Sequence, residues 1–144
     1  SPLAWGKAVV QAYDDFRADL VVFESNAPPG KPDVVPAVIK SVDPRGRIRW
    51  QPVRATADKA ARAAPVASLY EDGRVHHVMD ANNPNHLSLL EHEMVSWDPG
   101  DPRAASPNRL DALVHGVRFL LLGETFLVAP QSAGHRESNW KGRA

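Results

Sequence analysis

The spacing of apolar side chains predicts that helices and strands alternate along this chain. From Trp5 to Phe16, apolar residues recur every three or four positions, which predicts a helix that starts after Ser1 and ends near residue 17. Residues 20–23 then form a continuous apolar run rich in β-branched side chains. Such a run predicts a strand over residues 18–25 that is buried on both faces, as in a parallel sheet.

The same pattern predicts the next elements, in chain order. They are a loop over 26–33; a short helix over 34–42, with a strand as the alternative; a strand over 47–53, cut short by Pro52; an Ala-rich helix over 56–64, ending at Pro65; a turn and a short strand over 75–78; and an amphipathic helix over 86–97. Strands that alternate with helices favour an α/β domain with a mostly parallel sheet.

The segment 106–122, SPNRLDALVHGVRFLLL, has the clearest helical pattern. Ser106 is a suitable N-cap and Pro107 suits the first helical position. A buried stripe at helical spacing is formed by Leu110, Leu113, Val114, Val117 and Leu121. Asp111 lies about a quarter-turn from this stripe, at ~100° per residue. The segment therefore raises the question of why a carboxylate borders the core face of the helix.

Composition and charge narrow the possible functions. The chain has 144 residues, room for one domain, with 17 basic and 17 acidic residues. Net charge therefore does not indicate a nucleic-acid partner, and any basic surface must be local. The absence of cysteine excludes disulfides and thiolate metal sites. We expect a soluble, intracellular protein, because no apolar run approaches the ~20 residues that span a membrane and no segment resembles a secretory signal.

Two carboxylates stand out by context, and each has an ordinary alternative explanation. Glu24 closes the first predicted strand, and ligands of open α/β sheets gather beyond the carboxyl ends of strands. On this evidence alone, a solvated residue at the sheet edge is the favoured explanation for Glu24. Asp111 is in the first turn of its helix, where the helix dipole alone favours an anion. Neither residue is diagnostic by itself.

Several other polar residues are weaker candidates. Arg45, Arg47 and Arg49 surround a predicted turn and could contact DNA phosphates, as could Lys59 and Arg62 on the Ala-rich helix, although charged faces are usually only solvated. Glu91 and Glu93 are expected on the surface of their helix. The pair His76-His77 does not indicate zinc, since neither cysteine nor an HExxH spacing accompanies it.

The ordered set of polar motifs resembles the C-terminal nuclease domain of the large terminase subunit of tailed bacteriophages. The resemblance covers roughly residues 1–122. The matching positions are Lys59, Arg62 and Pro65; then Tyr70, Glu71, Gly73, Arg74, Val75 and His77; then Leu90, Glu91, Glu93 and Met94; and finally Ser106, Pro107, Arg109, Asp111, Ala112, Leu113 and Val114.

The resemblance implies a ribonuclease H-like fold and a nuclease that holds two divalent ions, Mg²⁺ or Mn²⁺, with carboxylates. It assigns Glu24 and Asp111 as catalytic and metal-binding residues, with Asn108 as a possible supporting residue one turn before Asp111. It further implies double-stranded DNA as substrate, the portal and the small terminase subunit as partners, no membrane association, and a location in the cytoplasm of the bacterial host. A helix docked by its apolar stripe would then direct Asp111 toward Glu24 over the sheet edge.

The chain also departs from the family pattern. The family's first catalytic Asp lies on a strand before the helix that opens this sequence, and the loop after Glu24 lacks the usual NQGG. We therefore expect a partial nuclease domain over residues 1–130, truncated at its N-terminus, with a polar, loosely ordered tail over 131–144. Such a fragment should be weakly active or inactive, and it should self-associate through the open sheet edge.

Two other functions remain open. One is a non-catalytic module of the packaging motor that contacts DNA or the portal. The other, less favoured, is a different ribonuclease H-like enzyme such as a transposase or integrase.

Overall fold

The computed structural model describes residues 1–28, 31–55, 57–101 and 107–123. These residues form two compact units, divided between Pro52 and Val53. The predicted tail at 131–144 lies outside the described residues. Within the described part of the chain, no helix is long and apolar enough to cross a membrane.

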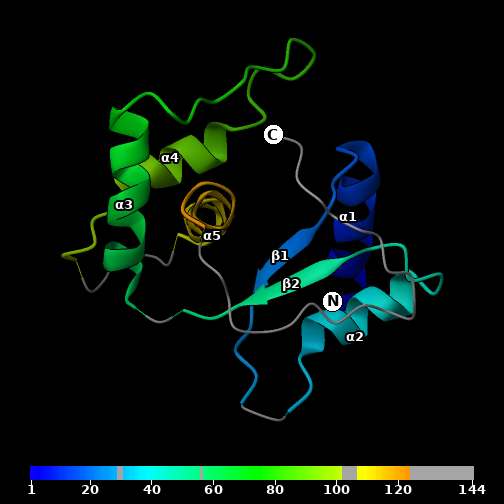
Figure 1. Ribbon diagram of the computed structural model, residues 1–144. Coiled ribbons are helices and arrows are strands. Elements are labelled where there is room, and N and C mark those ends of the chain that lie inside the picture. The colour runs from blue at the N-terminus through cyan, green and yellow to red at the C-terminus, as the bar shows by residue number, and fades with distance from the viewer. Residues whose placement is uncertain (29–30, 56, 102–106, 124–144) are drawn as a thin grey trace, which may run out of the picture. The chain divides into compact units, whose positions relative to one another are not determined.

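The N-terminal unit is a strand–helix–strand motif preceded by a helix. Its elements are α1 (Pro2–Asp15), β1 (Val21–Glu24), α2 (Val34–Val42) and β2 (Trp50–Val53), of which the last residue already belongs to the second unit. The strands β1 and β2 are hydrogen-bonded neighbours, and their arrows run in the same direction (Figure 1). A parallel pair needs a crossover connection, which α2 provides.

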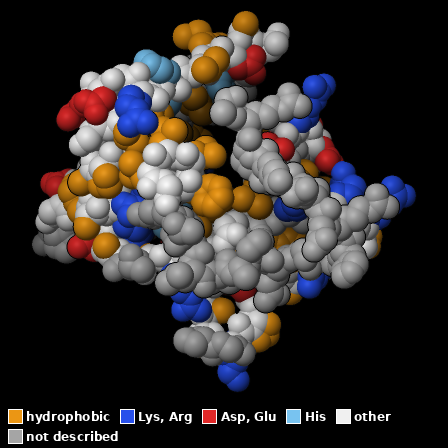
Figure 2. Space-filling view, in the orientation of Figure 1, with side chains coloured by type: hydrophobic (Ala, Val, Ile, Leu, Met, Phe, Trp, Pro, Cys, Tyr) orange, Lys and Arg blue, Asp and Glu red, His pale blue; other side chains and the backbone are white. Residues whose placement is uncertain are grey.

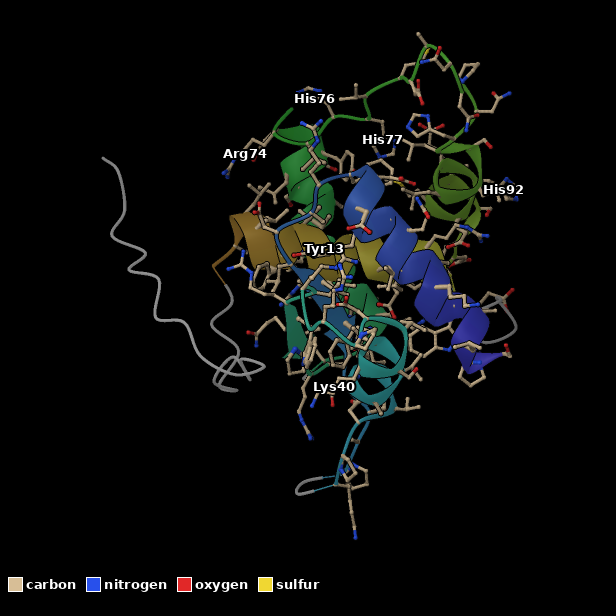
Figure 3. The ribbon with its side chains drawn as sticks, turned by 90° about the vertical axis from the view of Figure 1, so that its right-hand side faces the viewer. Tyr13, Lys40, Arg74, His76, His77 and His92 are labelled. Carbon is tan, nitrogen blue, oxygen red and sulfur yellow. The ribbon has the colours of Figure 1, made fainter. Side chains whose placement is uncertain are left out.

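Apolar side chains from all four elements form the core of this unit. Ile39, Ile48 and Trp50 are buried, and half-buried side chains of α1 and β1 pack against them, among them Tyr13 and Phe23. Figure 3 shows Tyr13 on α1 and Lys40 on α2. The ammonium of Lys40 lies 5.8 Å from the ring centroid of Trp50, which places a cation over the edge of the core.

The first helix confirms the sequence prediction, and Ser1 caps it by accepting a hydrogen bond from the backbone N–H of Ala4 at 3.4 Å. Residues 34–42 are a helix and not the alternative strand, because Asp33 caps the segment by accepting from Val35 N–H at 3.0 Å. The strand β1 is present, but its residues are half-buried rather than buried on both faces. Among the described residues, β1 has β2 as its only strand neighbour, which explains the exposure.

The second strand is shorter at its start than predicted and passes through Pro52 rather than ending there. The strand begins at Trp50 because the residues just before it are hydrogen-bonded to the buried carboxylate of Asp43. This carboxylate accepts from Ile48 N–H at 2.9 Å and from Arg47 Nε at 3.2 Å. Burial raises the pKa of Asp43, but these hydrogen bonds outweigh it and hold the pKa below the ordinary value.

The helical unit contains α3 (Lys59–Glu71), α4 (Ser88–Ser96) and α5 (Asn108–Leu121). The helices α3 and α4 both lie beside α5, which Figure 1 shows end-on. The core consists of buried side chains from α3 and α5, with half-buried Met94 and Trp97 packed against it: Val66, Leu69, Leu110, Val114 and Val117. The stripe predicted for 106–122 is therefore largely confirmed, although Leu121 is exposed.

Two predictions in the helical unit are wrong. The helix α3 does not end at Pro65 but continues through it to Glu71. Pro65 has no backbone N–H, so the helix loses one hydrogen bond there. Val66 and Leu69, which come after Pro65 in the helix, are buried in the core, and their burial outweighs that loss. The predicted strand over 75–78 is also absent from this described segment. Val75 packs on the core instead, and the side chain of His77 is held by hydrogen bonds from two helices.

The close approach of α1 and α2 generates a prediction at Gly6. A Cβ added there would lie 2.6 Å from Cγ1 of Val38, a stiff β-branched side chain. Gly6→Ala gains up to ~1 kcal/mol of helix propensity but overpacks the interface at a cost of about 1–3 kcal/mol. We expect a net loss of stability of about 1 kcal/mol in urea unfolding.

A matched control exists in α5. A Cβ on Gly116 meets no atom within 4 Å, so Gly116→Ala should raise stability by roughly 0.5–1 kcal/mol. If both substitutions raise stability, the described contact between α1 and α2 is wrong.

Candidate functional site

The two leading candidates lie in different compact units. Glu24 is the last residue of β1 and is half-buried, as predicted for a carboxylate at the end of a strand. Asp111 is in the first turn of α5, in the helical unit. Their predicted approach therefore stays a prediction.

The surroundings of Asp111 are defined by two cations of α3. Nη2 of Arg62 donates to Oδ1 of Asp111 at 2.7 Å, and Nζ of Lys59 lies 3.2 Å from Oδ2. The side chain of Arg62 is only 8% exposed, and its Nη1 also donates to the carbonyl of Ala57 at 2.7 Å. Both oxygens of the carboxylate thus have a cationic partner, and α3 is linked to α5.

The electrostatics of this group favour a charged carboxylate. Burial of the Asp111 side chain, 14% exposed, raises its pKa. The hydrogen bonds and charges of Arg62 and Lys59 outweigh that effect and lower the pKa below the ordinary value of 3.8. Asp111 is therefore an anion at neutral pH, as a metal ligand must be.

The sequence reasoning missed His115, which lies one turn beyond Asp111 on α5. It is 7% exposed, and a ring nitrogen lies within 4.8 Å of a carboxylate oxygen of Asp111. The spacing of four residues places both side chains on one face of the helix, so the D-x-x-x-H pattern was the available signal. Together, these two residues offer an oxygen and a nitrogen donor from one rigid element.

A small hollow opens beside Asp111. It is lined by Lys59, Ala63, Trp97, Pro107, Leu110, Asp111 and Val114, all from the helical unit. The lining includes Lys59 but not Arg62. The accessible side of the ion-paired cluster is therefore the side on which Lys59 lies.

The start of α5 is capped from α4 rather than by the predicted residue. Ser106 lies outside the described residues, and Pro107, at the N-cap position, provides no side-chain hydrogen bond. Instead, Oε2 of Glu93 accepts from the backbone N–H groups of Arg109 at 2.7 Å and Leu110 at 3.0 Å, while Oε1 pairs with the Arg109 guanidinium at 2.8 Å. Glu93 was expected on the surface, but it fixes the helix that carries Asp111.

The hydrogen bond from Leu110 N–H is the largest influence on the pKa of Glu93. Burial opposes it, but the bonds and charge of Arg109 add to it, and the pKa falls below the ordinary value of 4.5.

A phenol, an imidazole and a carboxylate form a continuous hydrogen-bonded chain in the same unit. The hydroxyl of Tyr70 lies 2.9 Å from Nε2 of His77, and Nδ1 of His77 lies 2.8 Å from Oε1 of Glu91. Figure 3 labels His77, and it shows His92 on the side of α4 that faces away from it. This series of hydrogen bonds joins α3 to α4. It gives the motif residues Tyr70, His77 and Glu91 a shared structural role.

The predicted DNA-contacting residues differ in their surroundings. Arg47 pairs with Asp14 at 2.9 Å and with Asp43, while Arg45 and Arg49 are exposed. Lys59 and Arg62 contact Asp111, as described. Asn108, the possible supporting residue, is exposed at the first position of α5. The role of all six residues in binding stays a prediction.

A family model described as the terminase RNaseH-like domain matches residues 1–118. No curated protein and no solved structure matches the chain.

The capping role of Glu93 predicts a specific dependence on pH. Its folded-state pKa is below the ordinary value, so its contribution to stability is present above about 4.5 and is lost as the pH falls through the folded pKa. Glu93→Gln should lower the urea midpoint at pH 7 and should differ less from the parent chain at pH 3. Glu71→Gln, at an exposed position at the end of α3, is the control and should change neither midpoint. A Glu93→Gln deficit of equal size at both pH values would contradict the role.

Proposed function

The chain belongs to the terminase RNaseH-like domain family, and from this premise we propose that it is the metal-dependent endonuclease module of a phage DNA-packaging terminase large subunit. Its fold is accordingly the ribonuclease H-like α/β fold, of which the parallel pair β1–β2 and the flanking helices are part. The substrate we propose is concatemeric double-stranded DNA, in the cytoplasm of the bacterial host. The portal and the small terminase subunit are the proposed partners.

The observation that supports this proposal most directly is the donor pair on α5. Asp111 and His115 lie within 4.8 Å through their ligand atoms and are little exposed, and the pKa of Asp111 keeps it ionised. A carboxylate is the oxygen ligand that Mg²⁺ and Mn²⁺ prefer. These residues fit a divalent cation, and Glu24 is proposed as the further carboxylate.

The family's nucleases generally use divalent metal ions. When bound by Asp111 and Glu24, such ions would supply Lewis-acid activation of a water molecule and stabilisation of the leaving oxygen in phosphodiester cleavage. The protein's own task is to hold its carboxylates ionised and in fixed positions. Capping of α5 by Glu93 and burial of its apolar stripe serve that task, because they fix the helix on which Asp111 and His115 lie.

A second candidate is supported by the ion pairs of Asp111. A carboxylate that already pairs with Arg62 and Lys59 has a structural role without any metal. The chain would then be a non-catalytic module of the packaging motor. Metal binding distinguishes the two functions.

The proposed metal site predicts that Mn²⁺ binds to the 144-residue chain through Asp111. Asp111→Asn should weaken Mn²⁺ binding at least tenfold in calorimetry, roughly the loss of 1.4 kcal/mol. Asp19→Asn, at an exposed position of the N-terminal unit, is the control and should bind like the parent chain.

In NMR spectra, Mn²⁺ should broaden the amide signals near both Asp111 and Glu24 at the same metal concentration. Broadening near Asp111 alone would exclude Glu24 from the site, and unchanged binding by Asp111→Asn would favour the second candidate.

The activity of this chain should be weak even with Mn²⁺. Glu24 and Asp111 are the two carboxylates proposed for the site, and a site with few anionic ligands binds a hard cation weakly. We expect slow or undetectable nicking of supercoiled plasmid DNA. Robust cleavage that depends on Glu24 would contradict this expectation and would indicate another acidic ligand.

The second edge of β1 is the proposed site of self-association. An unpaired edge invites strand addition from another chain, and β1 pairs only with β2 among the described residues. Sedimentation velocity over a wide range of protein concentrations should show a concentration-dependent dimer. A strictly monomeric species would contradict it.

A further inference from the structure

The two cations that hold Asp111 are not equivalent. Arg62 is 8% exposed, donates to Asp111 at 2.7 Å and is held a second time by the carbonyl of Ala57. Its own backbone carbonyl accepts from Nη1 of Arg118 at 3.0 Å, which fixes the segment further. A planar guanidinium with several bonds in fixed directions is a rigid partner for a carboxylate.

Lys59 contacts the other oxygen of Asp111 at the longer distance of 3.2 Å, and its side chain is 34% exposed. An ammonium on a flexible four-carbon stem reorients easily, and its charged end can return to water while the stem stays packed. The hollow beside Asp111 is lined by Lys59 and not by Arg62. A cation that approaches from the hollow therefore meets the lysine side of the carboxylate.

We propose that Arg62 is a fixed positioning residue for Asp111, whereas Lys59 is a displaceable counter-ion that leaves the carboxylate when a divalent cation binds there. This inference rests on the proposed metal-binding function. Lys59 supplies one positive charge to Asp111 in the absence of metal, and the incoming ion replaces that charge. Arg62 keeps its oxygen of the carboxylate in place in both states.

Removal of the competing charge at Lys59 should strengthen metal binding. Lys59→Met should bind Mn²⁺ roughly tenfold more tightly in calorimetry, because a like charge close to the ion is removed. Lys59→Arg retains the charge and should bind no more tightly than the parent chain. Equal Mn²⁺ affinities of Lys59→Met and the parent chain would overturn the proposal.

Displacement of Lys59 also has a readout independent of affinity. The Lys59 amine should be acetylated faster when MnCl₂ is present, as measured by peptide mass spectrometry after the folded chain has been labelled. Lys7, at an exposed position of α1, is the internal control and should react at the same rate with and without MnCl₂. An unchanged rate at Lys59 in a chain saturated with Mn²⁺ would overturn the proposal.

The fixed role of Arg62 is tested without metal. Loss of one member of a buried ion pair is strongly destabilising, so Arg62→Met should lower the melting temperature by roughly 10 °C, while Lys59→Met should change it little. Similar melting temperatures of the two variants would show that the cations are equivalent and would overturn the proposal.

The Asp111→Asn variant distinguishes failure of the proposed function from failure of the proposal about Lys59. If Asp111→Asn leaves Mn²⁺ binding unchanged, the proposed function fails. If Mn²⁺ binding depends on Asp111 but not on Lys59, only the proposal about Lys59 is overturned.

Discussion

The buried guanidinium of Arg62 is the constraint on which the helical unit depends. A charge this little exposed is tolerated only with an anion and hydrogen-bond acceptors beside it, and Asp111 together with the carbonyl of Ala57 supplies them. The partner must come from another helix, 49 residues further along the chain. Once α5 presents Asp111 to α3, Val114 and Val117 on α5 meet Val66 and Leu69 on α3. The ion pair and the apolar core therefore specify the same arrangement of these two helices.

The remaining polar contacts of the unit add to this arrangement rather than compete with it. Glu93 joins α4 to the start of α5, and the Tyr70–His77–Glu91 chain joins α3 to α4. Each helix is thus connected to the other two through a side chain that also satisfies a polar group. This mutual consistency explains how a small core holds the three helices together, although α4 itself contributes no fully buried residue.

The sequence was informative wherever structure depends on near neighbours. The first helix, β1 and the helix that carries Asp111 follow from the spacing of apolar residues, and the helix over 34–42 was one of two alternatives. Prediction failed where the structure depends on a contact between residues that are far apart in the sequence. The end of α3 was misplaced because Pro65 is a local stop signal, whereas Val66 and Leu69 are retained in the helix by a core built with α5. Glu93 was predicted to be a surface residue because its targets are 16 and 17 positions away.

The candidate site shows the same division. Asp111 could be selected from its place at the edge of an apolar stripe, and His115 could have been selected from the spacing of four. The partners Lys59 and Arg62 could not be assigned to Asp111 from spacing, although both are motif residues. Their basic character suggested phosphate contacts, since a sequence shows the charge of a residue but not the charge beside it.

A carboxylate at the edge of a core face can therefore serve two purposes at once. Its apolar neighbours fix the helix. One of its oxygens stays with the buried Arg62, while the other lies on the side of the half-buried Lys59. A residue with a single acceptor atom could not be both a structural partner and a ligand. The position of Asp111 on its helix, at the border between core and solvent, makes its structural role compatible with the proposed role as a ligand.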